Sequence, residues 1–90
     1  QDGVWEVGMQ NELVIYPNPV DEVLNINISP FNGNCIIAIF NINGQLIYSE
    51  TKYLFGETPI MVNNLNTGLY ELRITNYGTG KQIVTTFVKN

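Results

Sequence analysis

The chain has 90 residues, of which 44% are hydrophobic and 13% are charged, and its formal net charge at pH 7 is −4. This length suits one small domain, and a disordered tail would be more charged and less apolar. The four Lys and Arg residues are spread along the sequence, so they form no basic run of the kind that binds nucleic acid. The sequence therefore predicts one folded domain and no nucleic acid as a partner.

Residues 1–11 show no clear periodicity. Val4, Trp5 and Val7 could form a short edge strand. Chain ends without a periodic pattern are usually loosely held, so we interpret residues 1–11 as a linker or the tail of an upstream domain. Residues 12–90 are predicted to form the folded domain.

The next segments are typical of two strands with a bend between them. Residues 13–16 predict a first strand, and Pro17 ends it because the prolines on both sides of Asn18 remove two backbone donors. From residue 24 to residue 29, apolar and polar residues alternate, which is the pattern of a half-buried strand. Its core-facing residues are expected to be Leu24, Ile26 and Ile28.

Residues 35–40 are apolar on both faces of a strand, so we place this strand centrally in its sheet or under a covering loop. Cys35 begins the run and is the only cysteine, so no internal disulfide can form. We interpret Cys35 as a buried apolar residue, because free Cys is among the most buried residue types. The alternative is a reactive thiol or an intermolecular bridge, although the sequence has no His to activate the sulfur.

Turn-forming residues divide the rest of the chain into short strands. Asn43-Gly44 between apolar runs predicts a hairpin with a two-residue type I′ turn. Strands are also predicted over residues 70–75 and 83–88, and further turn signals lie at residues 30–34, 55–56, 63–68 and 77–80. Short β-branched and aromatic runs at this spacing are typical of an all-β sandwich or barrel.

The residues that usually carry catalysis are scarce in this sequence. Without His, neither a Ser-His-Asp nor a Cys-His arrangement can be built, and a zinc site would need more ligands than one Cys. Asp21 and Glu22 are adjacent, so their carboxylates would point to opposite faces of a strand, and we interpret them as a solvated turn. Calcium held by Asn18, Asp21 and loop carbonyls is a weaker alternative. The sequence predicts neither an enzyme nor a cofactor.

Aromatic side chains leave a second function open. Tyr70 lies on the apolar stripe of its strand and is expected in the core. Trp5, Tyr53 and Tyr77 are the candidates for an exposed row that stacks on sugar. Such a row would favour a carbohydrate- or protein-binding accessory module of a secreted hydrolase.

Four segments of the chain form an ordered set. They are Tyr16-Pro17-Asn18-Pro19, residues 39–45 with Asn43-Gly44, residues 65–70, and Thr86-Phe87-Val88-Lys89. In order and spacing they resemble the YPNP-like segment, the N-x-x-G-type turn, the L-x-x-G-x-Y segment and the lysine-bearing last strand of one family. That family is the C-terminal sorting domain of cargo proteins of the bacterial type IX secretion system, and the resemblance runs from about Leu13 to Asn90.

The resemblance implies an immunoglobulin-like antiparallel β-sandwich of about seven strands at the C-terminus of a secreted cargo. It implies transit through the periplasm, recognition by the outer-membrane translocon, and release to the cell surface or the medium. A sortase-like cysteine peptidase would then cleave before the domain, within residues 1–12, and attach the cargo to a surface anchor. The catalytic cysteine would belong to that partner and not to Cys35.

The resemblance also supplies the expected recognition residues. These motif residues are Pro17, Asn18, Pro19, Gly44, Leu65, Gly68, Tyr70, Phe87, Val88 and Lys89. The last strand is expected to be a recognition element, because a terminal strand can present edge hydrogen-bond groups to a partner. The same property would allow a homodimer through edge strands. Gly68 is expected to need an unusual φ, so that a larger residue would strain its turn.

Overall fold

The structure is a computed structural model, and it describes residues 12–90. Its regular elements are the strands β1 (Glu12–Tyr16), β2 (Val23–Asn41), β3 (Leu46–Met61), β4 (Gly68–Asn76) and β5 (Gln82–Lys89). No helix within residues 12–90 is long and apolar enough to cross a membrane. The predictions for residues 1–11, including those for Trp5, lie outside the described part of the chain.

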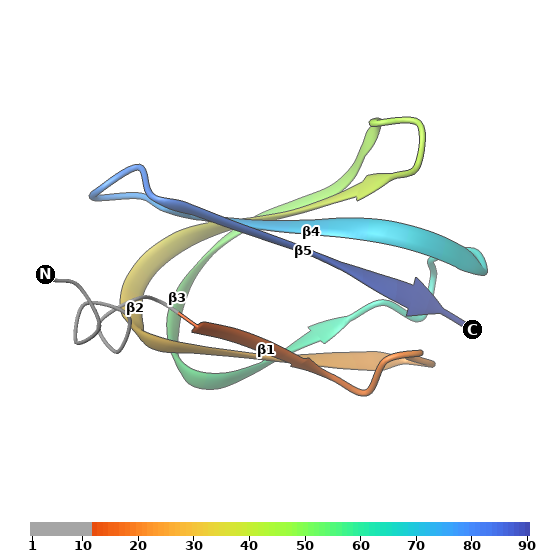
Figure 1. Ribbon diagram of the computed structural model, residues 1–90, viewed down its shortest axis with the longest axis horizontal. Helices are drawn as coiled ribbons and strands as arrows, with labels where there is room; N and C mark the ends of the chain where they lie inside the picture. The colour runs from red at the N-terminus through yellow and green to blue at the C-terminus, as the bar shows by residue number, and fades with distance from the viewer. Residues whose placement is uncertain (1–11) are drawn as a thin grey trace, which may run out of the picture.

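Strand β2 is the centre of the fold, and every pairing between the five strands is antiparallel. Its first half pairs with β1 and with the second half of β3. Its second half pairs with the first half of β3 and with β4, which pairs in turn with β5. Both long strands bend between their halves, so each contributes to both layers of the sandwich (Figure 1). The halves act as separate strands, and the predicted antiparallel sandwich of about seven strands is confirmed.

The bends replace two of the turns that the sequence analysis predicts. Between Ile28 and Gly33 the register of the β2–β3 pair shifts, so that residues 29–32 stand against Phe55 alone. Gly33 and Gly56 have φ values of 125° and 70° at this point. Inserted residues of this kind bend a strand without ending it. The predictions of chain-reversing turns at residues 30–34 and 55–56 are therefore wrong, because the glycines serve a bulge.

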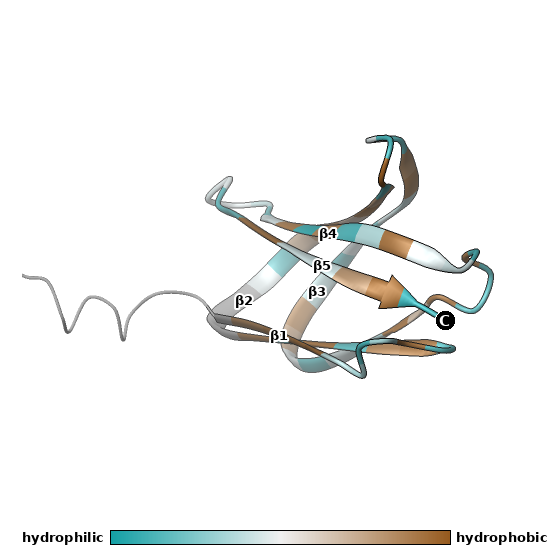
Figure 2. Ribbon diagram, turned by 45° about the vertical axis from the view of Figure 1, so that its right-hand side comes forward, coloured by the Kyte–Doolittle hydropathy of each residue, from teal (hydrophilic) through white to brown (hydrophobic). Residues whose placement is uncertain are grey.

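The core lies between the two layers and follows the alternation of apolar residues along the strands (Figure 2). The predicted core-facing residues Leu24, Ile26 and Ile28 are all buried. Cys35 is fully buried, which confirms its interpretation as a core residue, and burial raises the pKa of its thiol. The fully buried core side chains with the largest volumes include Phe87, Leu24, Ile26, Ile37, Ile39, Leu54, Ile60, Leu72 and Ile74.

The second half of β2 occupies the central position that its two apolar faces predict. It pairs with β3 on one side and with β4 on the other. Its outward-facing residues Ile36 and Phe40 are half-buried. The guanidinium carbon of Arg73 lies 4.7 Å from the centroid of the Phe40 ring, so a cation on β4 covers part of this outer face.

The hairpin at Asn43-Gly44 has a longer loop than predicted. The Asn41 N–H donates to the Gln45 carbonyl at 3.0 Å, and the Gly44 N–H donates to the Asn41 carbonyl at 2.9 Å. Residues 42–44 therefore form a three-residue loop, and the two-residue type I′ prediction is wrong. The Asn41 side chain explains the difference, because its Oδ1 accepts hydrogen bonds from the N–H groups of Asn43 and Gln45. Gly44 has a φ of 82°, which suits the left-handed position of such a loop.

Candidate recognition site

Most motif residues lie at the end of the sandwich that holds Asn90. Figure 1 places the loop after β1, the β3–β4 connection and the end of β5 at this end. The β2–β3 hairpin adjoins it, because a cavity of about 280 Å³ is lined by Gly44 together with Leu69, Tyr70 and Thr86. The fold therefore gathers segments that are far apart in the sequence.

The loop after β1 holds the end of β5 by backbone hydrogen bonds. The Val20 N–H donates to the Val88 carbonyl at 2.8 Å, and the Asn90 N–H donates to the Val20 carbonyl at 2.9 Å. These bonds form a parallel bridge between Val20 and Lys89. Residues 18–21 and 88–90 are called the latch below, because they join the first strand's loop to the last strand.

Side chains complete the latch on both sides of Val20. The Oδ1 of Asn18 accepts a hydrogen bond from the Val88 N–H at 2.9 Å, and the Nδ2 of Asn90 donates to Asp21 Oδ1 at 3.0 Å. The peptide bonds before Pro17 and Pro19 are both cis. Asn18 thus supplies an acceptor for the strand end, whereas the prolines beside it cannot donate.

Replacement of Asn18 by Ala is expected to lower the free energy of unfolding by about 0.5–1.5 kcal/mol, because the Val88 N–H loses its acceptor. Urea unfolding of the purified chain measures this loss, and amide exchange at Val88 should quicken. Asn18→Asp keeps an acceptor oxygen and is the matched control. An equal loss in both variants would show that the hydrogen bond is not what stabilises the latch.

Tyr70 and Phe87 join the latch to the core. They are cross-strand partners in the β4–β5 pair, with ring centroids 5.5 Å apart and stacked planes. Both are buried, which confirms the prediction that Tyr70 belongs to the core. The Tyr70 hydroxyl donates to the Asn66 carbonyl at 2.6 Å and so fixes the β3–β4 connection. The two rings therefore support the end of β5 from inside the sandwich.

Lys89 faces inward although it carries a charge. It lies on the same inner side of β5 as Phe87, and only 8% of its surface is exposed. Its Nζ donates a hydrogen bond to the Asn90 carbonyl at 2.9 Å. The ammonium group is thereby directed at the end of the described chain. Its position makes Lys89 part of the packing at this end rather than an open surface charge.

The other motif residues divide between surface and interior. Pro17, Asn18, Pro19, Gly44 and Val88 are exposed, whereas Leu65 is half-buried and packs against the core. Gly68 has a φ of 157°, a backbone conformation that residues with a side chain rarely adopt, although an added Cβ would meet only the Tyr70 ring, at 3.9 Å. The φ of Gly68 agrees with the expectation that a larger residue would be strained there, and Gly44, with a φ of 82°, is a second motif glycine of this kind.

Val20, Asp21 and Asn90 also belong to the latch, and no pattern in the sequence indicates this role for them. Asp21 was interpreted only as part of a solvated turn or as a calcium ligand. In the structure the Oδ1 atoms of Asn18 and Asp21 both accept hydrogen bonds from the end of β5. Within residues 12–90, no group of three or more His, Cys, Asp or Glu side chains is placed to hold a metal ion.

Tyr16, the last residue of β1, joins β1 to the second half of β3. Its hydroxyl donates to the Glu57 carboxylate on β3. This hydrogen bond is the main reason that the pKa of Tyr16 is raised, because ionisation of the phenol would break the bond and set two negative charges side by side.

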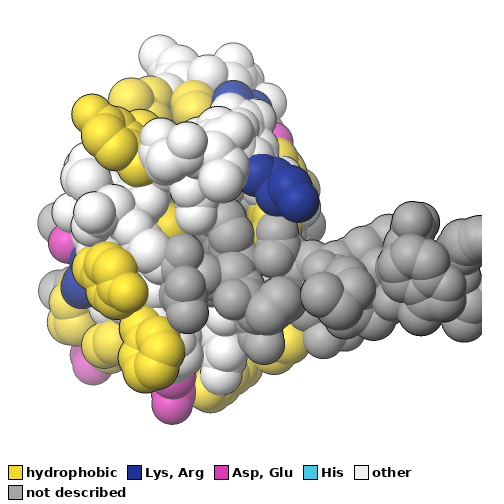
Figure 3. All heavy atoms as spheres, turned by 90° about the vertical axis from the view of Figure 1, so that its left-hand side faces the viewer, with side chains coloured by type: hydrophobic (Ala, Val, Ile, Leu, Met, Phe, Trp, Pro, Cys, Tyr) yellow, Lys and Arg dark blue, Asp and Glu magenta, His cyan; other side chains and the backbone are white. Residues whose placement is uncertain are grey.

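The aromatic candidates for sugar stacking lie toward the other end of the sandwich. Tyr53 and Tyr77 are 61% and 69% exposed. Asn34 stands between them, because it is the cross-strand partner of Tyr53 and its carbonyl accepts the Tyr77 N–H. Figure 3 shows that the hydrophobic side chains of this end form separate groups among polar atoms. The described residues thus place Tyr53 and Tyr77 on either side of Asn34.

The geometry defines a small β-sandwich whose first loop and last strand close one end, with its distinctive sequence segments gathered there. Such a domain offers a shaped surface to a partner. Residues 14–90 match the family described as the secretion system C-terminal sorting domain. The chain belongs to this family, and it is a C-terminal sorting signal for type IX secretion.

Among solved structures, the chain is similar to PorZ of Porphyromonas gingivalis, described as an essential bacterial surface component of the type-IX secretion system. The TM-score is 0.66 at 18% sequence identity, and the match covers 87% of this chain and 11% of PorZ. This likeness supports the fold. None of the curated proteins matches the chain.

Proposed function

We propose that the outer-membrane translocon of the type IX system recognises this sorting domain at its latch end. The observation that carries the proposal is the hydrogen-bonded contact of Asn18 and Val20 with Val88 and Asn90. Two of the four segments that resemble the family pattern meet in this contact. A partner bound there would touch both segments at once.

The latch favours a translocon that binds the surface of this end of the domain over one that adds a strand to the edge of β5. At Gly68 and Leu69, β4 pairs with one edge of the last residues of β5, and the latch occupies the other edge. A translocon strand could pair with Val88 only by displacing Asn18 and Val20. The exposed side chains of Pro17, Pro19 and Val88 are therefore the proposed contact residues.

In this proposal, the partner proteins and not the sorting domain catalyse the cleavage and anchoring of the cargo. The domain itself is not an enzyme, and a sortase-like cysteine peptidase cleaves within residues 1–12. Cys35 is buried, and burial raises the pKa of its thiol, so the thiolate that attacks a peptide is disfavoured. The cargo would pass through the periplasm and end at the cell surface or outside the cell.

A secretion assay tests the proposed role. The chain is fused behind a signal peptide and a fluorescent reporter, and expressed in a type IX-competent bacterium and in a strain without the translocon. We expect reporter at the surface or in the medium only where the translocon is present. Reporter held in the periplasm of both strains, with the domain folded, would contradict the proposal.

A homodimer through edge strands is a further prediction. Among the described strands, β1, β3 and β5 each pair with one named neighbour only and so keep one edge for a partner. The bridge between Val20 and Lys89 occupies part of the β1–β5 side. Strand β3 is the longest of the three.

A further inference from the structure

The outer edge of β3 is the longest open edge among the described strands. β3 has 16 residues and pairs only with β2. Pro59 in its second half cannot donate a backbone hydrogen bond. The first half, from Leu46 to Phe55, is therefore the part of this edge that could accept another strand.

This half of β3 is complementary to itself. Consider a second copy that pairs antiparallel with this edge, with a twofold axis at Thr51. Each residue then faces the residue of the partner subunit that lies equally far from Thr51 in the opposite direction along the chain. Glu50 then lies opposite Lys52 of the partner subunit, and Lys52 lies opposite Glu50 of the partner subunit. Opposite charges at directly facing positions stabilise a strand pair, and like charges destabilise it.

The uncharged positions of the same register also match. Ile47 would face Phe55 of the partner subunit, and Thr51 would face its own copy. Ile47 and Phe55 are 40% and 71% exposed within one chain, so pairing would cover apolar surface that now meets solvent. Apolar–aromatic and Thr–Thr pairs are among the favourable cross-strand pairs.

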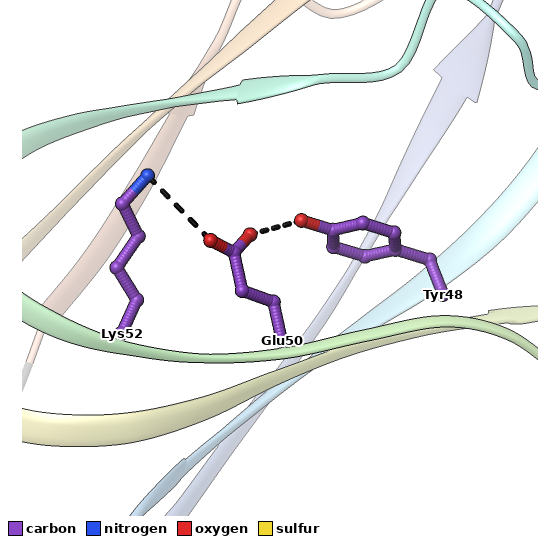
Figure 4. A network of polar contacts seen from close by, with 3 residues as sticks. All are labelled: Tyr48, Glu50 and Lys52. Atoms are coloured by element: carbon purple, nitrogen blue, oxygen red, sulfur yellow. Dashed lines mark hydrogen bonds and ion pairs between the residues drawn. The ribbon is translucent and has the colours of Figure 1, made fainter.

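Glu50 and Lys52 lie on the edge strand, and the ion pair between them within one chain is weak. Figure 4 shows Tyr48, Glu50 and Lys52 projecting from the same side of β3. The Lys52 Nζ lies 3.8 Å from Glu50 Oε2, and both side chains are about one-third exposed. An ion pair of this kind contributes little by itself, so the Lys52 ammonium remains open to a partner. The Glu50 carboxylate also accepts a hydrogen bond from the Tyr48 hydroxyl through its other oxygen, which fixes its position on the edge strand. Glu50 and Lys52 also line a cavity of about 380 Å³ with Ile60 and Met61 at this open side of the sandwich.

Charged side chains on the inner side of an edge strand normally discourage pairing with other chains. Here they would discourage any strand that lacks opposite charges at the facing positions. We infer that the partner of the β3 edge is a second copy of this chain, paired antiparallel about Thr51 through Glu50 and Lys52 of each copy. The first halves of both β3 strands would then join two sheets into one.

Sedimentation of the full chain over a concentration series tests this inference. The wild-type chain should dimerise. Lys52→Glu should raise the dissociation constant of the dimer about tenfold or more, because two attractive cross-strand pairs become repulsive. Lys81→Glu is the matched control, since it changes the net charge equally at an exposed position in the β4–β5 turn, and it should leave the dissociation constant unchanged.

Mixing two variants makes the test independent of folding losses. Glu50→Lys carries lysine at both positions and Lys52→Glu carries glutamate at both, so each alone should stay largely monomeric. An equimolar mixture should form heterodimers with wild-type-like affinity. A wild-type chain that stays monomeric at its solubility limit would overturn the inference. Equal dimerisation of Lys52→Glu and Lys81→Glu, or a mixture without heterodimers, would overturn it as well.

Discussion

Removal of residues 86–90 is expected to abolish export of a cargo fused to this domain. The deletion takes away the buried Phe87 ring, the strand end that pairs with Gly68 and Leu69, and the β5 side of the latch. Both the fold and the proposed recognition surface depend on these residues. Surface reporter in a type IX-competent strain measures the effect, and undiminished export of the shortened chain would refute the proposed role of this end.

A matched pair of substitutions separates recognition from folding. Val84 and Val88 lie on the same outer face of β5 and are 49% and 40% exposed. Val88→Lys alters the latch end, whereas Val84→Lys makes the same change nearer the middle of the strand. We expect both variants to fold and only Val88→Lys to lose export. Equal export of the two would place the recognition surface elsewhere.

Phe87→Ala is expected to lower the free energy of unfolding by about 3–5 kcal/mol, the usual cost of removing a buried ring. Phe87 is fully buried and stacks on Tyr70, so its loss leaves a cavity beneath the latch. Small domains have a total stability of only about 5–15 kcal/mol, and a large share of the chain should then be unfolded at moderate temperature. Urea or thermal unfolding measures the change.

Thr86→Ala is the control for this substitution. Thr86 is the exposed neighbour of Phe87 on the same strand. Its replacement should change the free energy of unfolding by less than about 0.5 kcal/mol. A loss at Thr86 as large as that at Phe87 would mean that strand pairing, rather than the buried ring, sets the stability of this end.

Alternation made much of the fold predictable. The apolar positions of residues 24–28 and 70–74 recur with the period of a strand, and the structure buries them. The two apolar faces of residues 35–40 correctly predicted a central strand, because such a strand has neighbours on both edges. These predictions rest on local periodicity, which the sequence contains directly.

Long-range pairing and side-chain hydrogen bonds were beyond such reasoning. Gly33 and Gly56 suggested turns, but each lies in a strand whose partner continues through the bend. The oxygen of Asn41 lengthens the Asn43-Gly44 loop, and an Asn-Gly pair alone does not reveal that contact. The partnership of Asn18 with Val88 joins positions 70 residues apart, and composition does not indicate it.

The candidate site was predictable as a set of residues and not as a surface. The family resemblance indicated Tyr70, Phe87 and Lys89 together with Pro17 and Val88. The structure buries the first three and exposes the other two. Burial of a residue depends on which face of its strand meets the opposite layer, so motif membership alone could not assign the residues to core or contact.

The latch can form only after the last strand of this domain has been synthesised. Proteins are made from the N-terminus, so residues 18–21 emerge well before residues 88–90 can meet them. A ribosome that stops early would release a chain without the last strand, and its sandwich would stay open. If recognition requires the latch, only a domain that has its last strand in place would be recognised. The order of the strands along the chain would then be enough to exclude an incompletely synthesised sorting domain from recognition.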